Sequence, residues 1–221
     1  MQQEIFEFPQ IDRLDWSDFV VSEENRKAVR YLIEWPNWES NGIIIYGESG
    51  TGKTHLAALW AQTANAVYIL KESLNYDPRD LFNAECNFVL DNFDYYLKNQ
   101  NWLFHFLNII KEKKRYFLIL SRNSPMSMDV DLKDLKSRIF SSVCVNIKSP
   151  GDDLLLKISR KIAKDLQISV SDNMLEYILA LVDRKVTCIS NVLKMLDKLS
   201  LRLKVPLSIS FAKKYLQLTG N

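Results

Sequence analysis

The segment GESGTGKT, residues 47–54, constrains the fold of this chain more than any other part of its sequence. It fits the pattern G-x-x-x-x-G-K-[ST] at every fixed position and lies between the apolar run IIIY and the helical pattern KTHLAALWAQT. In this context glycines let the backbone close around phosphate groups, and the following helix adds the partial positive charge of its N-terminus. The segment therefore predicts a phosphate-binding loop between a strand and a helix.

The chemistry of such a loop gives its residues roles. Lys53 is expected to reach the β- and γ-phosphates of a nucleotide, and the Thr54 hydroxyl to bind Mg²⁺. Asp91 ends the apolar strand NFVL and is expected to hold the same metal ion through water. We therefore predict ADP or ATP with Mg²⁺ as the ligands. The expected nucleotide contacts in this segment are Gly47, Glu48, Ser49, Gly50, Thr51, Gly52, Lys53, Thr54 and the next residue, His55.

Residue 92 bears on hydrolysis. An efficient ATPase needs an acid after the metal-binding aspartate to orient the attacking water, and this chain has Asn92 there. An amide can hold a water molecule but cannot accept its proton. Asp94 is the nearest acid that could substitute. We expect firm nucleotide binding with weak intrinsic ATPase activity, which leaves open whether the chain is an enzyme.

Five short runs are nearly continuously apolar and rich in β-branched or aromatic residues, which is typical of strands buried on both faces of a parallel sheet. Helical patterns alternate with them over 25–34, 53–63 and 101–113. This alternation predicts an α/β domain with a five-stranded parallel sheet between helices. The expected strands are 42–46, 66–70, 87–90, 116–120 and 142–147.

The pattern changes after the turn Ser149-Pro150-Gly151, where amphipathic helices replace strands. Residues 1–150 contain 17 basic and 20 acidic residues, whereas 151–221 contain 12 and 7. We predict an N-terminal peptide over 1–17, a nucleotide-binding α/β domain over 18–150 and a small, basic, all-α lid over 151–221. The lid helices are expected at 152–166, 171–182 (N-cap Ser171), 188–203 and 208–218 (N-cap Ser208).

Composition excludes several classes of protein. A net charge of +2 is too small to indicate a dedicated nucleic-acid binder, so we expect DNA contact to be weak or indirect. No run approaches the roughly 18 apolar residues that span a bilayer, and the first residues lack the basic and apolar regions of a secretory signal. The three cysteines are too few and too widely spaced for a disulfide framework. We expect a cytoplasmic protein with no membrane partner.

The chain contains the motifs DFVVSEEN at 18–25, GIIIYGESGTGKTHL at 42–56, Asp91-Asn92, LILSRNSP at 118–125 and DLKSR at 134–138. Together these motifs resemble the AAA+ domain of DnaA-type bacterial replication initiators, over about residues 1–218. The resemblance is closest to the short Hda-like paralogues, the regulatory inactivators of DnaA. It implies an AAA+ P-loop NTPase fold and a role, with the DNA-loaded sliding clamp, in promoting ATP hydrolysis by DnaA and preventing re-initiation.

The resemblance also carries over residue roles. Phe19, Val20 and Asn25 match the adenine side of the nucleotide pocket. The phosphate-sensing residue lies in Ser121-Arg122-Asn123, where the alignment leaves its position open and Asn123 is our choice. Arg138 matches an arginine finger supplied in trans to a neighbouring subunit, so it joins Asp91 and Asn92 as an expected catalytic residue. Thr187 stands where the family has a lid arginine. Either a nearby cation (Arg184 or Lys185) replaces that arginine, or the lid contact is lost.

The chain ends at Asn221, where the family's lid ends, and about 17 residues precede Phe19, as expected of the paralogue and not of an initiator with a C-terminal DNA-binding domain. The implied partners are DnaA and the DNA polymerase III sliding clamp (β subunit), and self-association stays open. The clamp would be bound by Gln3, Ile5, Phe6 and Phe8 of the N-terminal peptide. The alternative for this peptide is a strand packed on its own domain. Alternative functions are a stand-alone AAA+ ATPase or helicase loader, and a non-hydrolysing adaptor that binds DnaA.

Overall fold

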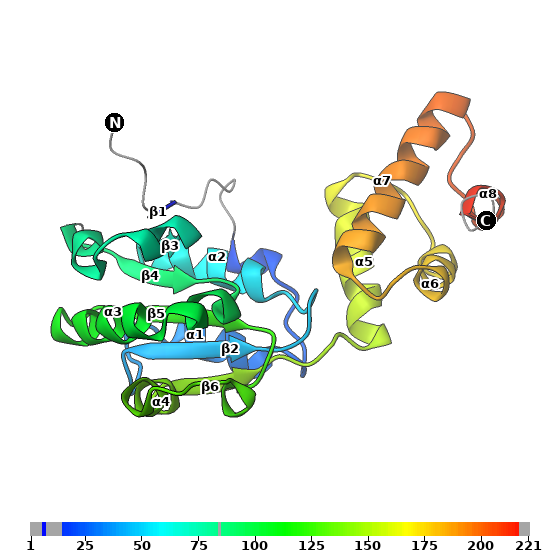
Figure 1. Cartoon of the computed structure of the whole chain (residues 1–221). Helices are drawn as coiled ribbons and strands as arrows, with labels where there is room; N and C mark the ends of the chain where they lie inside the picture. The colour runs from blue at the N-terminus through cyan, green and yellow to red at the C-terminus, as the bar shows by residue number, and fades with distance from the viewer. Residues whose placement is uncertain (1–5, 8–14, 84, 217–221) are drawn as a thin grey trace. The chain divides into compact units, whose positions relative to one another are not determined.

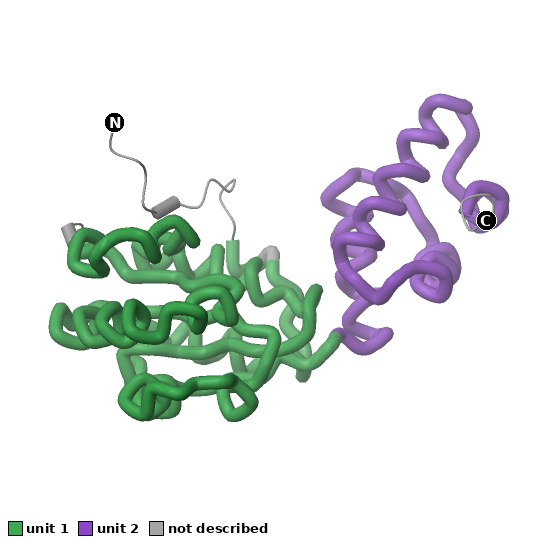
Figure 2. Tube along the Cα trace, viewed as in Figure 1, with its two compact units in different colours: residues 1–149 green, residues 150–221 purple. Residues whose placement is uncertain are grey.

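The computed structural model describes residues 6–7, 15–83 and 85–216 (Figure 1). The chain divides into two compact units, residues 1–149 and 150–221 (Figure 2). No helix of the described residues is long and apolar enough to cross a membrane.

The first unit is built on a parallel sheet, as the sequence predicted. Its strand order is β1-β3-β4-β5-β2-β6, so β2, which leads into the phosphate-loop segment, lies between β5 and β6. Each neighbouring pair among the last five strands in this order is parallel. The bounds are β2 (Gly42–Tyr46), β3 (Ala66–Ile69), β4 (Asn87–Leu90), β5 (Phe117–Ser121) and β6 (Val143–Asn146).

A short edge strand, β1 (Phe6–Glu7), extends the sheet and pairs antiparallel with β3, with Phe6 opposite Ile69 and Glu7 opposite Tyr68. This pairing corresponds to the alternative arrangement of the N-terminal peptide, a strand packed on its own domain. Three of the residues expected to bind the clamp, Gln3, Ile5 and Phe8, lie outside the described residues.

Helices cover both faces of this sheet (Figure 1). On one face α1 (Arg26–Ile33) and α2 (Lys53–Thr63) pack over Ile43 and Ile45, and on the other α3 (Gln100–Glu112) and α4 (Lys133–Phe140) pack over Ile44. Because successive strand residues point to opposite faces, a run such as GIIIY must be apolar throughout when both faces are buried. The short 3₁₀ helices are η1 (Trp16–Asp18), η2 (Lys71–Asn75), η3 (Pro78–Asn83), η4 (Phe93–Asn99) and η5 (Pro125–Ser127).

The second unit is all helical, with α5 (Asp152–Asp165), α6 (Asp172–Leu181), α7 (Val186–Leu203) and α8 (Ile209–Leu216). Leu155, Ile178, Leu193 and Phe211, one from each helix, share its core. Both predicted N-caps are confirmed: the hydroxyl of Ser171 accepts a hydrogen bond from Met174 N, and that of Ser208 accepts one from Phe211 N.

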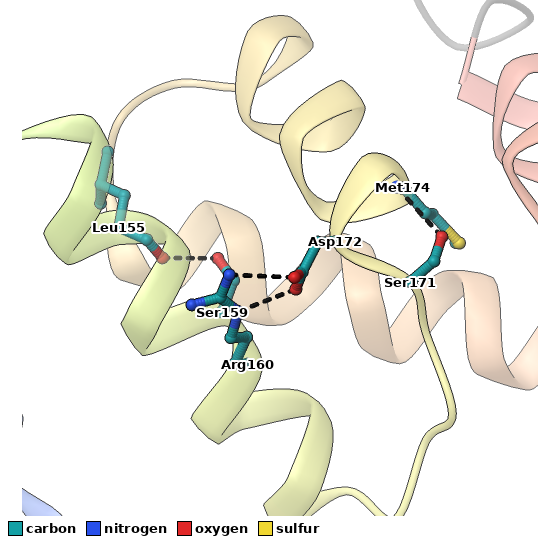
Figure 3. Close-up of polar contacts among 6 residues, drawn as sticks. All are labelled: Leu155, Ser159, Arg160, Ser171, Asp172 and Met174. Carbon is teal, nitrogen blue, oxygen red and sulfur yellow. Dashed lines mark hydrogen bonds and ion pairs between the residues drawn. The ribbon is translucent and has the colours of Figure 1, made fainter.

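A polar junction joins α5 to the start of α6 (Figure 3). The guanidinium of Arg160 donates two hydrogen bonds, of 2.8 and 3.0 Å, to the two carboxylate oxygens of Asp172. The buried hydroxyl of the preceding residue, Ser159, donates at 2.7 Å to Leu155 O, one turn earlier in α5. The bond from Arg160 lowers the pKa of Asp172. An acid in the first turn of α6 is also favoured by the positive end of the helix dipole.

Candidate nucleotide site

The loop at residues 47–54 has a backbone that requires glycine. Gly52 has φ +92°, and Gly47 has φ +153°. A Cβ atom added to Gly47 would lie 2.2 Å from the backbone oxygen of Ile147. The loop is thus held against the segment that follows β6, and Gly47 N also donates to Ser121 O at the end of β5 (3.2 Å). Its shape is fixed by the strands on both sides of β2.

The ammonium group of Lys53 lies within the curve of this loop. Its Nζ is 2.7 Å from each of the carbonyl oxygens of Gly47 and Glu48, and 3.4 Å from Thr51 Oγ1. Burial lowers the pKa of Lys53, and the negative charge of Asp91 raises it. A cation surrounded by oxygen acceptors inside a glycine-rich turn can exchange those acceptors for phosphate oxygens.

A second cation near the loop is Arg122, which the sequence left open beside Asn123 as the phosphate sensor. It lies close enough to Lys53 for its positive charge to lower the pKa of Lys53. Arg122 directly follows β5, the strand beside β2, and its side chain is exposed. The expected phosphate sensor, Asn123, is exposed as well, and its backbone is held by the hydroxyl of Ser121, which accepts from Asn123 N at 3.1 Å.

The structure brings the two expected magnesium ligands together. Thr54 Oγ1, at the start of α2, lies 3.1 Å from Asp91 Oδ2, and the other carboxylate oxygen accepts from Asn92 N at 2.7 Å. Within the described part of the chain no group of three or more His, Cys, Asp or Glu side chains could hold a metal ion. A hydroxyl beside one carboxylate fits Mg²⁺, which takes a few oxygen ligands from the protein and the rest from phosphates and water.

Asn92 is exposed, with φ +55° and ψ +58°. Asparagine is one of the residues that tolerates this left-handed conformation best. Its carbonyl oxygen accepts from Tyr95 N and so starts η4. Asp94, the candidate substitute acid, is exposed in η4. The asparagine at residue 92 therefore fits the left-handed turn before η4, whatever its part in hydrolysis.

Of the residues expected on the adenine side, Phe19 contacts the loop residue His55, and Asn25 makes its hydrogen bonds within its own segment. Phe19 and His55 meet edge to face, with ring centroids 5.3 Å apart, and a Cβ at Gly52 would be 3.4 Å from the Phe19 ring. Asn25 is buried, and its side chain accepts from Ser22 N and donates to the carbonyl oxygen of Val20. Phe19 and His55 are thus at the loop, whereas Asn25 folds the segment that carries Phe19.

Other parts of the loop and of the lid also have defined contacts. The hydroxyl of Ser149 donates to Glu48 Oε2 at 2.6 Å, a contact that no sequence pattern indicated. In the second unit Thr187 is exposed near the start of α7. The two cations considered as its substitutes are paired with acids, Arg184 with Asp152 at 2.8 Å and Lys185 with Asp183 at 3.5 Å.

Arg138 lies near the end of α4 and is half-buried. Its carbonyl oxygen accepts hydrogen bonds from the hydroxyls of Ser141 (2.8 Å) and Ser142 (3.3 Å), which fix the last turn of the helix. Among the described residues its guanidinium has no ion pair or hydrogen bond, and none joins it to the loop of its own chain. The structure does not bring Arg138 into the site formed by Lys53, Thr54 and Asp91.

No family model matches the chain. Among curated proteins, it is 28% identical over 186 residues to an uncharacterized protein from Haemophilus influenzae, covering 79% of this chain and 80% of that protein. It is 25% identical over 224 residues to the chromosomal replication initiator protein DnaA of Thermosipho africanus, covering 88% of this chain. It spans about half the length of the DnaA proteins that it matches.

Solved structures show the fold. Domain III of the Thermotoga maritima replication initiation protein DnaA superposes with a TM-score of 0.73 at 19% identity, covering 89% of this chain and 92% of that one. The T. maritima RuvB Holliday junction branch migration motor superposes with a TM-score of 0.71 at 14% identity, covering 92% of this chain and 71% of that one. AMPPCP-bound DnaA from Aquifex aeolicus superposes with a TM-score of 0.67 at 22% identity, covering 81% of this chain and 63% of that one.

The chain therefore has the fold of an AAA+ P-loop NTPase, with a parallel sheet, the phosphate-loop pattern after β2 and a helical unit after the sheet. It shares this fold with domain III of DnaA, and its sequence is similar to that of DnaA over most of its length.

Proposed function

We propose that the chain binds ADP or ATP with Mg²⁺ and hydrolyses ATP slowly. The observation that carries the proposal is the convergence of Lys53, Thr54 and Asp91 at one end of β2 and β4. The resident Mg²⁺ would be held by the Thr54 hydroxyl and the Asp91 carboxylate. It would supply charge neutralisation for the phosphates. Asn92 cannot accept a proton from water, which supports slow turnover.

We further propose that the chain regulates the initiation of chromosomal replication, in the cytoplasm, by promoting ATP hydrolysis on DnaA. Arg138 would act in trans as the arginine finger. In well-studied GTPases such a residue raises the rate by ~10³–10⁵-fold, because it neutralises charge on the transferring phosphoryl group. Two features support this role: the guanidinium has no partner among the described residues, and the Ser141 and Ser142 hydroxyls fix the helix end that carries it.

Docking on the sliding clamp is the part of the proposal that rests on the sequence alone. Gln3, Ile5, Phe6 and Phe8 would supply the clamp-binding peptide. The pairing of Phe6 and Glu7 with β3 is a competing arrangement, so clamp binding would require this two-residue strand to detach. Because two residue pairs are a short ladder, detachment would cost little.

The experiment is single-turnover hydrolysis of ATP bound to DnaA, with clamp loaded on DNA, with and without this protein. We expect faster hydrolysis with the wild type and no stimulation with Arg138→Ala, while the variant's own nucleotide affinity is unchanged. Lys136→Ala, which removes a cation of the same helix, is the matched control and should retain stimulation. Unchanged DnaA turnover with the wild type would reject the regulatory role and leave nucleotide binding untouched.

Asn92 favours a second candidate function, a non-hydrolysing adaptor that binds DnaA. The adaptor would bind DnaA in pull-down or light-scattering assays without changing the rate of ATP loss. A stand-alone ATPase or helicase loader would instead turn over ATP by itself, with a helicase as its partner.

A further inference from the structure

The hydroxyl of Tyr68 is a buried polar group that has no role in the nucleotide binding proposed above. Its Oη atom is shielded from solvent and has no hydrogen-bond partner among the described residues. An unpaired buried hydroxyl costs free energy, so each case in a folded protein calls for an explanation. A phenylalanine would fill nearly the same space without that cost.

The sheet register places Tyr68 near the proposed magnesium ligands. Tyr68 on β3 pairs with Val89 on β4, and both pack in the core beneath α2. Paired residues share a face of the sheet, and residues two apart on a strand do as well. Tyr68, Val89 and Asp91 therefore lie on the α2 side, where Asp91 accepts the hydrogen bond from Thr54.

Electrostatics agree with this placement. Burial raises the pKa of Tyr68, and the negative charge of Asp91 raises it further. The phenol is therefore neutral at physiological pH and keeps its proton as a hydrogen-bond donor.

The carboxylate of Asp91 can accept further hydrogen bonds. At present Oδ2 accepts from the Thr54 hydroxyl and Oδ1 from Asn92 N. A carboxylate oxygen has two lone pairs, so Oδ1 and Oδ2 each have room for a second donor beside the bonds that they already accept. Tyr68 is a buried, unpaired donor on the same face of the sheet as Asp91.

We propose that Tyr68 is a positioning residue for Asp91: its hydroxyl donates, through one bound water molecule, to the Asp91 carboxylate in the magnesium-nucleotide complex. This inference rests on the proposed binding of nucleotide with Mg²⁺. A water-mediated hydrogen bond is nearly as favourable as a direct one, so its loss should weaken the magnesium-dependent part of nucleotide affinity about five- to tenfold.

Tyr96 supplies a matched control. Its phenol is also buried and also feels the charge of Asp91, but its hydroxyl donates to the carbonyl oxygen of Ile69. Tyr96→Phe therefore removes a hydroxyl of the same kind whose hydrogen bond is already made within the fold. That variant should lose stability and keep its response to Mg²⁺.

The experiment measures ADP affinity by calorimetry in Mg²⁺ and in EDTA, and the melting midpoint of the nucleotide-free protein, for the wild type and both variants. For Tyr68→Phe we expect the gain in affinity from Mg²⁺ to fall about five- to tenfold. Its affinity in EDTA should equal the wild type's, and its melting midpoint should be no lower. For Tyr96→Phe we expect the same gain in ADP affinity from Mg²⁺ as in the wild type, and a lower melting midpoint.

The positioning role would be overturned if Mg²⁺ raised the ADP affinity of Tyr68→Phe as much as that of the wild type. It would also be overturned if the variant lost affinity equally in Mg²⁺ and in EDTA. Either result would leave the proposed function intact. A lowered midpoint in Tyr68→Phe would show that its hydroxyl is paired within the fold, and would overturn the role as well. A wild-type protein with no affinity for ADP in Mg²⁺ would overturn the proposed function itself.

Discussion

Thr54 Oγ1 donates a hydrogen bond of 3.1 Å to Asp91 Oδ2, across 37 residues of sequence. The bond joins the first turn of α2 to the end of β4, and so it links the two parts of the chain that the sequence assigned to one metal ion. Such a pair is arranged to share Mg²⁺ with the phosphates of a nucleotide.

Replacing either member of this pair should separate metal binding from nucleotide binding. For Thr54→Ala and Asp91→Asn we expect the affinity for ADP in Mg²⁺ to fall at least about tenfold, with little change in EDTA. Thr54→Ala removes an oxygen ligand, and Asp91→Asn removes the negative charge that attracts the metal ion. Isothermal titration calorimetry in both buffers measures this. Thr63→Ala, at the other end of α2, should behave as wild type, although it loses the bond from Thr63 Oγ1 to Leu59 O. An equal loss in both buffers would reject the assignment of metal ligands.

The close approach of Gly47 to Ile147 predicts a strong effect of a single methyl group. In Gly47→Ala the new Cβ would lie 2.2 Å from the backbone oxygen of Ile147, so either the phosphate loop or the segment after β6 must move. We expect a loss of about 1–3 kcal/mol in the free energy of unfolding, measured by urea denaturation, and weaker nucleotide binding. Gly151→Ala, where φ is −72°, is the control and should change little. Wild-type stability in Gly47→Ala would contradict the loop geometry.

Asn92→Asp should restore the acid that the site lacks. Aspartate also tolerates the left-handed backbone found here, so the fold should be retained. General-base catalysis contributes about 10²–10⁴-fold in rate, and we expect at least a tenfold rise in the intrinsic ATPase rate, measured by phosphate release. Asn92→Ala, which has neither amide nor carboxylate, controls for loss of the side chain and should not exceed wild type. If the aspartate variant is equally slow, residue 92 does not face the attacking water.

The pair of Arg160 and Asp172 should make the stability of the second unit depend on pH. The pKa of Asp172 is lowered in the folded state, so its contribution is complete above the ordinary aspartate pKa (~3.9) and is lost as the pH falls through the lower, folded value. The melting midpoints of wild type and Arg160→Ala should therefore differ at pH 7 and converge at acid pH. Because the pair is exposed, the difference should be small. Arg202→Ala is the control, and a difference independent of pH would contradict the assignment.

Much of the fold could be predicted because its signals are local. The run GIIIY must be a strand buried on both faces, and the glycines and Lys53 that follow it define the loop by spacing alone. The hydroxyl N-cap of Ser171 marks the start of α6 in the same way. These features depend on residues within a few positions of one another, which a sequence shows directly.

Other features depend on contacts that the sequence order conceals. Helix α4 has no side-chain cap at its N-cap residue, Leu132, and it spans only eight residues, so its signal is weak. Arg122 lies near Lys53 because β5 pairs with β2, and Tyr68 faces the α2 side because β3 pairs with β4. Strand order comes from non-local pairing, so no local pattern singled out Tyr68 or favoured Arg122 over Asn123.

Binding of ADP and ATP to the purified wild-type chain, with Lys53→Ala beside it, tests most directly whether this loop holds the phosphates of a nucleotide. Calorimetry in Mg²⁺ should give saturable, one-site binding for the wild type and an affinity at least about tenfold weaker for the variant, because Lys53 supplies the cation inside the loop. The absence of detectable binding heat with the wild type, or equal affinity in the Lys53→Ala variant, would contradict the assignment of this loop as the phosphate-binding site.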